Sequence, residues 1–186
     1  MFDHSAILAI KGDDEETDTT HIVALGDLNV NVSDFERSRA WYQMMGYQVT
    51  STLAPTESIE VSNALGFDEK IELDGAVLTH PEDDSTIELT QWLTPYDAEP
   101  PYPVPINHFG IHRTAFLTSD IEGDVAALKA QGVEFVSPIT PCCTGEDSSG
   151  SIVAFYDPDG TIVELAAFPF GDTFFKVMRW FLNTFY

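Results

Sequence analysis

The sequence predicts an α+β fold made of two similar halves, each consisting of a strand, a helix and then three strands. Residues 32–49 and 118–135 share the same pattern, at a constant offset of 86 residues. Each has a Ser-Asp pair, then an amphipathic stretch, a glycine and a short segment typical of a strand. Each half later ends in an apolar strand with one glutamate, IELTQW at 87–92 and VELAAF at 163–168. A duplicated unit of this length implies two similar half-structures, with a groove between them that suits a ligand.

The predicted helices of the two halves begin and end with the same residue types. Ser33 opens an S-x-x-E capping box with Glu36, and the helix runs to about residue 45, where Gly46 stops it. The second half repeats this pattern at Ser119, Glu122 and Gly132. We therefore expect two helices that cross their sheets in the same way.

The remaining elements are mostly strands. Residues 22–32 alternate apolar and polar side chains from Leu28 onward, which is typical of a half-buried strand. A short helix is expected around 59–65, and the sequence Asp-Pro-Asp-Gly at 157–160 predicts a tight turn. The other expected strands are 47–52, 70–80, 86–92, 133–138, 151–157 and 161–168.

These elements divide the chain into five segments. The acidic start has neither periodicity nor apolar anchors, five prolines mark an extended linker, and an amphipathic apolar stripe marks a final helix. This last helix is expected to pack on its own domain or on a dimer partner, with a pocket lid or a membrane-surface helix as alternatives. The segments are a flexible arm at 1–20, a first βαβββ module at 21–93, a Pro-rich linker at 94–107, a second βαβββ module at 108–169 and an amphipathic helix at 170–186.

The charge of the chain limits its partners. Acidic residues outnumber basic ones by 31 to 8, which gives a formal net charge of −23. This balance argues against nucleic acid and against an anionic membrane surface, because both need a basic footprint. The first residues lack the basic start and long apolar run of a signal peptide, so a cytoplasmic location is expected.

The two cysteines, Cys142 and Cys143, are adjacent in a glycine- and proline-containing loop. Their spacing fits neither a zinc site nor a redox pair, and a bridge between neighbours requires a strained ring. We expect reduced loop thiols, with a redox role as the alternative.

Several stretches resemble the vicinal oxygen chelate superfamily, which includes glyoxalase I, fosfomycin and bleomycin resistance proteins and extradiol dioxygenases. The resemblance covers about residues 22–168 and rests on SDFERSRAWYQMMGY, IELTQW, DIEGDVAALKAQGVEFVSP and above all FYDPDGTIVEL. It implies that the two βαβββ modules pair to form a curved mixed sheet around a pocket. It also implies a homodimer, because members commonly pair, and in active members a divalent metal.

The resemblance implies four positions for metal ligands, one on the first strand and one on the last strand of each module. These positions hold Asp27, Glu88, Arg113 and Glu164, so both glutamates match the family and neither of its usual first-strand histidines does. A guanidinium has no lone pair to offer a cation, so Arg113 cannot be a ligand. We expect no metal cofactor; the alternative is a hard divalent ion on Asp27, Glu88 and Glu164.

Other residues of the predicted pocket follow from the alternation of side chains along each strand. The expected substrate-binding residues are Asn29, Asn31, Trp92, His112 and Phe168, with His108 as a further nearby candidate. A bulge could turn His112 inward as a metal ligand.

The resemblance and the residues together leave three functions open. In the first, Arg113 pairs with one or two of the carboxylates, and a third, crowded by like charge, has a raised pKa and moves a proton in an isomerase, lyase or cyclase reaction. The catalytic residues would be Asp27, Glu88, Arg113 and Glu164. The second is a sequestering protein of the bleomycin-resistance type, whose aromatic walls stack a planar ligand. The third is a metal-dependent lyase or dioxygenase.

Overall fold

The computed structural model describes residues 25–97, 107, 109–111, 113–142 and 150–168. The predicted arm at 1–20, the predicted helix at 170–186, His108 and His112 lie outside these residues. Within the described part of the chain, no helix is long and apolar enough to cross a membrane.

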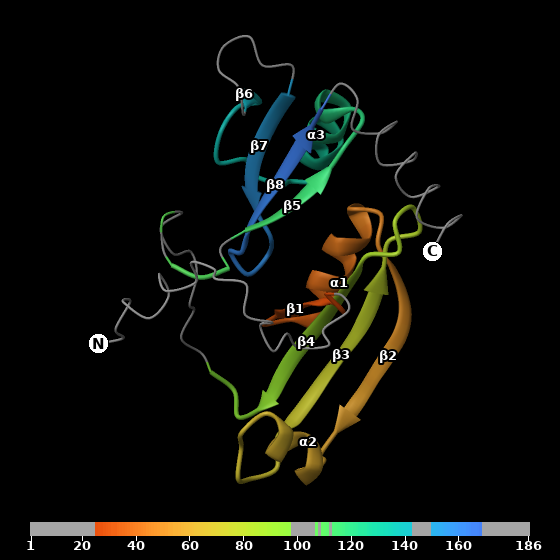
Figure 1. The fold of residues 1–186 in the computed structure, drawn as a ribbon, viewed down its shortest axis with the longest axis vertical. Coiled ribbons are helices and arrows are strands. Elements are labelled where there is room, and N and C mark those ends of the chain that lie inside the picture. The colour runs from red at the N-terminus through yellow and green to blue at the C-terminus, as the bar shows by residue number, and fades with distance from the viewer. Residues whose placement is uncertain (1–24, 98–106, 108, 112, 143–149, 169–186) are drawn as a thin grey trace, which may run out of the picture.

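The first module forms a four-stranded mixed sheet with the strand order β1-β4-β3-β2 (Figure 1). β1 runs parallel to β4, whereas β4, β3 and β2 pair antiparallel. The elements are β1 (Leu28–Asn31), α1 (Phe35–Met44), β2 (Gln48–Thr56), α2 (Ile59–Ala64), β3 (Glu72–Thr79) and β4 (Thr86–Thr94).

The second module repeats this arrangement with the order β5-β8-β7-β6. β5 runs parallel to β8, and the other neighbours are antiparallel. The elements are β5 (Arg113–Leu117), α3 (Ile121–Ala130), β6 (Thr140–Cys142), β7 (Gly150–Tyr156) and β8 (Ile162–Ala167). The predicted α+β class with two βαβββ modules is confirmed.

One predicted strand is wrong. Residues 133–138 make a single bridge, between Phe135 and Phe155, and the second strand of the module lies later, at β6. The chain pairs continuously with β7 beyond Pro138, at β6, which itself contains Pro141. β6 is an edge strand, where a proline is tolerated.

The N-caps of α1 and α3 are the aspartates Asp34 and Asp120 and not the predicted serines. The side chain of Asp34 accepts a hydrogen bond from the backbone N–H of Arg37 at 3.0 Å, and Asp120 accepts one from Gly123 at 3.0 Å. Aspartate caps a helix as well as serine does, so the sequence allowed either residue. Ser33 lies one position before the N-cap of α1 and binds Asp159 of the second module.

The three helices in the described part of the chain end in the same motif. After each last turn a glycine takes a positive φ, 95° at Gly46, 84° at Gly66 and 88° at Gly132. The next residue then donates its N–H back to the carbonyl of the residue five positions earlier, as in Tyr47 to Tyr42 at 3.3 Å. This Schellman motif satisfies the carbonyls at the helix end and stops the helix.

Gly46→Ala is expected to destabilise the protein more than Gly66→Ala. Both glycines have a positive φ, which costs a residue with a Cβ about 1–2 kcal/mol. A Cβ at Gly46 would also lie 2.7 Å from Nε2 of His80, whereas nothing lies within 4 Å at Gly66. Urea unfolding should therefore show a loss of about 1 kcal/mol at Gly66 and about 2–3 kcal/mol at Gly46. Equal losses would contradict the contact with His80.

The expectation of reduced thiols is wrong for Cys142, which is disulfide-bonded in the structure. The sequence holds one other cysteine, Cys143, which lies outside the described residues. Cys142 is buried at the end of the edge strand β6, opposite Gly150.

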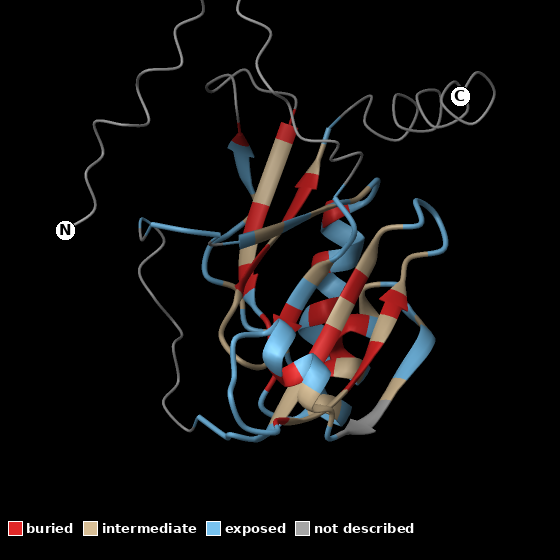
Figure 2. Ribbon diagram, turned by 60° about the horizontal axis from the view of Figure 1, so that its bottom comes forward, coloured by how far each residue is buried: buried red, intermediate tan, exposed pale blue. Residues whose placement is uncertain are grey.

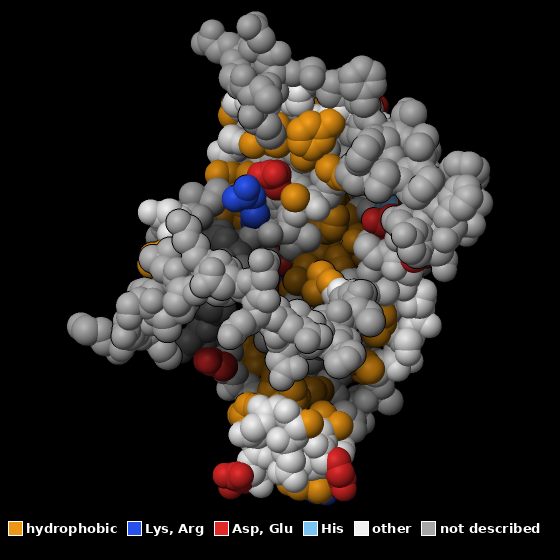
Figure 3. Space-filling view, in the orientation of Figure 1, with side chains coloured by type: hydrophobic (Ala, Val, Ile, Leu, Met, Phe, Trp, Pro, Cys, Tyr) orange, Lys and Arg blue, Asp and Glu red, His pale blue; other side chains and the backbone are white. Residues whose placement is uncertain are grey.

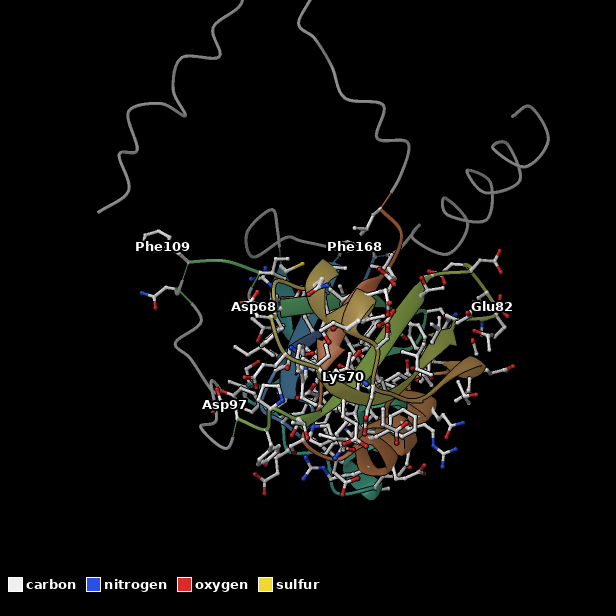
Figure 4. All side chains as sticks on the ribbon, turned by 90° about the horizontal axis from the view of Figure 1, so that it is seen from below. Asp68, Lys70, Glu82, Asp97, Phe109 and Phe168 are labelled. Carbon is white, nitrogen blue, oxygen red and sulfur yellow. The ribbon has the colours of Figure 1, made fainter. Side chains whose placement is uncertain are left out.

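One hydrophobic core joins the two modules. α1 and α3 lie on the same side of both sheets, behind them in Figure 1 and below them in Figure 4. Buried residues, red on the ribbon of Figure 2, run along both sheets and both helices. Trp41 on α1 contacts Phe155 on β7 with ring centroids 5.9 Å apart. Other members of the cluster are Val30, Leu78, Leu89, Leu128, Val163 and Leu165.

The turn between β7 and β8 attaches the second module to the start of α1. The carboxylate of Asp159 accepts hydrogen bonds from the backbone N–H of Ser33 at 3.2 Å and from the hydroxyl of Ser38 at 3.2 Å. It also forms an ion pair with Arg37 at 2.7 Å. The predicted Asp-Pro-Asp-Gly turn therefore closes a hairpin and also fixes how the modules sit against each other.

A buried tyrosine makes this contact sensitive to alkaline pH. The hydroxyl of Tyr42 donates to the carboxylate of Asp157 at 3.2 Å. Burial raises the pKa of Tyr42 above its ordinary value of 10.0, and the charge of Asp157 raises it further. The folded state keeps this proton where the unfolded chain has lost it, so stability falls as the pH rises above about 10.

Tyr42→Phe is therefore expected to flatten the loss of stability between neutral and alkaline pH. At pH 7 the variant should lose about 1 kcal/mol, because one buried hydrogen bond disappears. Urea unfolding at pH 7 and about pH 10.5 measures both effects. Tyr156→Phe, at an exposed position, serves as the control and should change neither. An unchanged alkaline slope in Tyr42→Phe would show that another group titrates.

Candidate functional site

The face of the two sheets that α1 and α3 do not cover is called the open face, and it is turned toward the viewer in Figures 1 and 3. Strand alternation assigns residues to it, because their neighbours in sequence are buried in the core. On β4, Ile87 and Leu89 are core residues, so Glu88 lies on the open face. On β8, Val163 and Leu165 are core residues, so Glu164 lies there too.

Glu88 is held in place by two neighbours on the open face. Its Oε1 accepts a hydrogen bond from Nδ2 of Asn29 at 3.1 Å and one from the hydroxyl of Thr90 at 3.3 Å. The same Nδ2 donates to the Thr90 hydroxyl oxygen at 3.1 Å. Among the described residues no partner binds Oε2 of Glu88. The carboxylate is thus oriented by one oxygen while the other can meet a ligand.

Trp92 lies two residues farther along β4 on the same face as Thr90. Its indole N–H donates to Oδ1 of Asn31 at 2.9 Å, and its ring contacts Phe67 with centroids 5.4 Å apart. Asn29 and Asn31, both predicted to bind substrate, thus orient Glu88 and Trp92. Phe67 was not predicted from the sequence.

The second sheet contributes one ion pair to the open face. Nε of Arg113 lies 3.2 Å from Oε2 of Glu164, and their side chains are 49% and 15% exposed. In Figure 3 a basic side chain, in blue, lies beside an acidic one, in red, on this face. Among the described residues no partner binds the two terminal nitrogens of Arg113, so they can donate to an anionic oxygen. Strand pairing places six apolar residues and one tyrosine on this face: Ala115, Leu117, Ile152, Ala154, Ile162, Ala166 and Tyr156.

Phe168 follows β8 at the edge of the open face. A Cβ on Gly150 would lie 2.8 Å from the ring of Phe168. The ring can pack here because Gly150 has no side chain. Phe168 is 40% exposed and can contact a ligand (Figure 4).

Asp27 does not join the other carboxylates. It is exposed and precedes β1, whose first paired residue is Leu28. Within the described part of the chain, no group of three His, Cys, Asp or Glu side chains could hold a metal ion. The alternative trio Asp27, Glu88 and Glu164 is therefore not assembled, and the predicted crowding of three carboxylates is not observed.

The chain matches known proteins both in sequence and in fold. A sequence profile of the Glyoxalase/Bleomycin resistance protein/Dioxygenase superfamily matches residues 20–165. The chain belongs to this superfamily. The resemblance given by the sequence motifs is thereby confirmed. No protein among those with curated descriptions matches the chain closely enough to count as a relative.

Solved structures of this superfamily show the same fold. A glyoxalase family protein from Bacillus cereus matches with a TM-score of 0.71 and 20% identity, covering 81% of this chain and 97% of its own. A domain from Frankia reaches 0.55 at 16% identity, covering 78% and 98%. A glyoxalase family protein from Enterococcus faecalis reaches 0.53 at 21% identity, covering 77% and 96%. Identities this low establish the fold alone.

Proposed function

We propose that this superfamily member is a metal-independent enzyme that moves a proton on a small oxygenated molecule, in an isomerase, lyase or cyclase reaction. The observation that supports this most is the arrangement of Glu88, with one oxygen held by Asn29 and Thr90 and the other without a partner among the described residues. A carboxylate that acts as a general base must be held in position and must also keep one oxygen available to accept a proton. Glu88 meets both requirements.

Arg113 supplies the second part of the proposed chemistry. When a base removes a proton from a carbon next to a carbonyl, the electron pair of the C–H bond moves onto the carbonyl oxygen. The terminal nitrogens of Arg113 would donate to this oxyanion, and its Nε stays on Glu164. Returning the proton to another carbon gives an isomerase, and loss of a leaving group gives a lyase.

Solvent exchange tests this proposal even when the product of the reaction is unknown. In D₂O, proton abstraction should replace with deuterium the hydrogen on the carbon next to the carbonyl group, which is C3 of a bound 2-oxo carboxylate or C2 of a bound 2-hydroxy carboxylate. ¹H NMR detects the loss of this hydrogen signal. We expect enzyme-dependent exchange for at least one member of such a panel. A compound that binds without exchanging would instead favour the alternative, a sequestering protein in which Trp92 and Phe168 stack a planar ligand.

The metal-free part of the proposal has its own test. The support for it is chemical, because the first-strand position of the second module holds an arginine that is paired with Glu164. Protein purified without chelator should contain no stoichiometric metal, and exchange should survive treatment with a chelator. Stoichiometric iron, manganese, nickel or zinc that exchange requires would contradict it.

We also propose that the chain acts as a homodimer. The support is the resemblance to a superfamily whose members commonly pair. Sedimentation equilibrium should give twice the monomer mass at micromolar concentration, and a monomer would contradict the dimer.

A further inference from the structure

Two asparagines of β1 present oriented polar atoms on the open face. Asn29 and Asn31 are both exposed there, because Val30 between them is buried in the core. We infer that the substrate carries a hydroxyl group whose O–H donates to Oδ1 of Asn29, and a carbonyl oxygen that accepts a hydrogen bond from Nδ2 of Asn31. This inference rests on the proposed function and adds the class of its substrate, a hydroxylated oxo acid.

The amide of Asn29 has only its oxygen left for a ligand. Its Nδ2 donates to Oε1 of Glu88 at 3.1 Å and to the hydroxyl oxygen of Thr90 at 3.1 Å. These two bonds use both N–H groups of the amide. An ionised carboxylate accepts hydrogen bonds and cannot donate them, so the nitrogen must be the atom that faces Glu88. Among the described residues no partner binds Oδ1 of Asn29, which is therefore an oriented acceptor.

The amide of Asn31 is turned the other way. Its Oδ1 accepts the indole N–H of Trp92 at 2.9 Å. An indole nitrogen can only donate, so the oxygen of Asn31 must be the atom that faces Trp92. The Nδ2 of Asn31 then lies on the far side of the amide, and among the described residues nothing accepts its N–H groups. β1 thus offers an oriented donor two residues after an oriented acceptor.

The acceptor of Asn29 lies next to the proposed base. The parallel pairing of β1 with β4 places Asn29 opposite Glu88 and Asn31 opposite Thr90. Oδ1 of Asn29 and Oε2 of Glu88 are therefore neighbouring acceptors. They favour a ligand that brings a hydroxyl group, because a carbonyl oxygen at this place would meet acceptors only and leave them without a hydrogen bond.

The donor of Asn31 lies farther along β1. Side chains two residues apart on one face of a strand are about 7 Å apart. In a 2-hydroxy-4-oxo acid the hydroxyl and carbonyl oxygens lie about 3–5 Å apart, and each hydrogen bond adds up to about 3 Å. A compound of this kind therefore spans the two asparagines.

Three related acids test the inference on the full chain. 2-Hydroxy-4-oxopentanoate carries both groups, 4-oxopentanoate lacks the hydroxyl group and 2-hydroxypentanoate lacks the oxo group. NMR titration measures their dissociation constants. We expect the first acid to bind about fivefold more tightly than each of the others, because each of the others loses one hydrogen bond.

Two variants should separate the two contacts. Asn31→Asp keeps an oxygen for the indole of Trp92 and replaces the free donor with an acceptor. The advantage of the oxo group should then disappear, while the advantage of the hydroxyl group stays. Asn29→Ala should do the reverse. The indole N–H signal of Trp92 in ¹H–¹⁵N spectra shows whether its hydrogen bond persists in Asn31→Asp.

Asn63→Asp is the matched control, because Asn63 is exposed on α2 and the change in charge is the same. It should keep both advantages. Equal affinity for the three acids, or no binding of any of them by a protein that exchanges other carboxylates, would overturn the inference. The proposed function would then stand if exchange still needs Glu88.

Loss of both advantages in either variant would also overturn the inference, because the asparagines would then act only by holding the site together. Failure of all three acids to bind, together with no exchange in the wider panel, would overturn the proposed function itself.

Discussion

Replacing Glu88 with glutamine is expected to slow proton exchange about a hundred- to ten-thousand-fold while leaving ligand affinity within about threefold. The amide keeps the shape of the side chain and can still accept the hydrogen bonds of Asn29 and Thr90 through its oxygen. It cannot take up a proton at the pH of the assay. The change should therefore remove the base and preserve the site.

Two further variants sharpen this prediction. Glu82→Gln, in the exposed loop between β3 and β4, is the matched control and should exchange like the wild type. Asn29→Ala should leave Glu88 present but less well oriented, so the exchange rate should fall by a smaller factor than in Glu88→Gln. Asn29→Gln should not restore the rate, because its longer side chain puts the amide donor in the wrong place. If Glu88→Gln keeps full exchange, Glu88 is not the base. If it abolishes binding as well, its role is in holding the ligand.

Replacing Arg113 with methionine is expected to weaken binding of a carboxylate ligand about ten- to a hundredfold. The variant removes the free terminal nitrogens, and it leaves Glu164 without its cation next to an anionic ligand. Arg113→Lys keeps the charge but not the planar pair of donors, so its affinity should be intermediate. Isothermal titration calorimetry with a bound member of the carboxylate panel measures the loss.

Arg39→Met controls for the change in net charge, because Arg39 lies on α1 and pairs with Glu36 away from the open face. Its affinity should match that of the wild type. Equal weakening in Arg39→Met would show that the ligand responds to overall charge, and unchanged affinity in Arg113→Met would remove Arg113 from the site.

The register of the site could be predicted from the sequence because it depends on local pattern. The repeat offset aligned Asn29 with Ala115, and in the structure these two residues pair with Glu88 and Glu164 respectively. Strand alternation then placed both glutamates on the face away from the core. The ion pair between Arg113 and a carboxylate could also be predicted from the sequence, because a guanidinium surrounded by acidic side chains forms an ion pair with one of them.

Other features of the site depend on contacts that the local pattern does not contain. Asp27 stands just before the first paired residue of β1, so the alternation of the strand does not fix its side chain. Phe67 contacts Trp92 on a strand far along the chain, and the buried hydroxyl of Ser62 accepts the N–H of Ile71, nine residues later. A helix of six residues gives too short a pattern to show this.

The open faces of the two sheets are proposed to form one site for a small molecule, with Glu88 and Arg113 on the same ligand. A crystal structure of the full chain with a carboxylate that undergoes exchange tests this most directly. We expect a carboxylate or carbonyl oxygen on the terminal nitrogens of Arg113 and the exchanging carbon next to the free oxygen of Glu88. A ligand that contacts one of these residues without the other, or that lies on the helical side of the sheets, would contradict it.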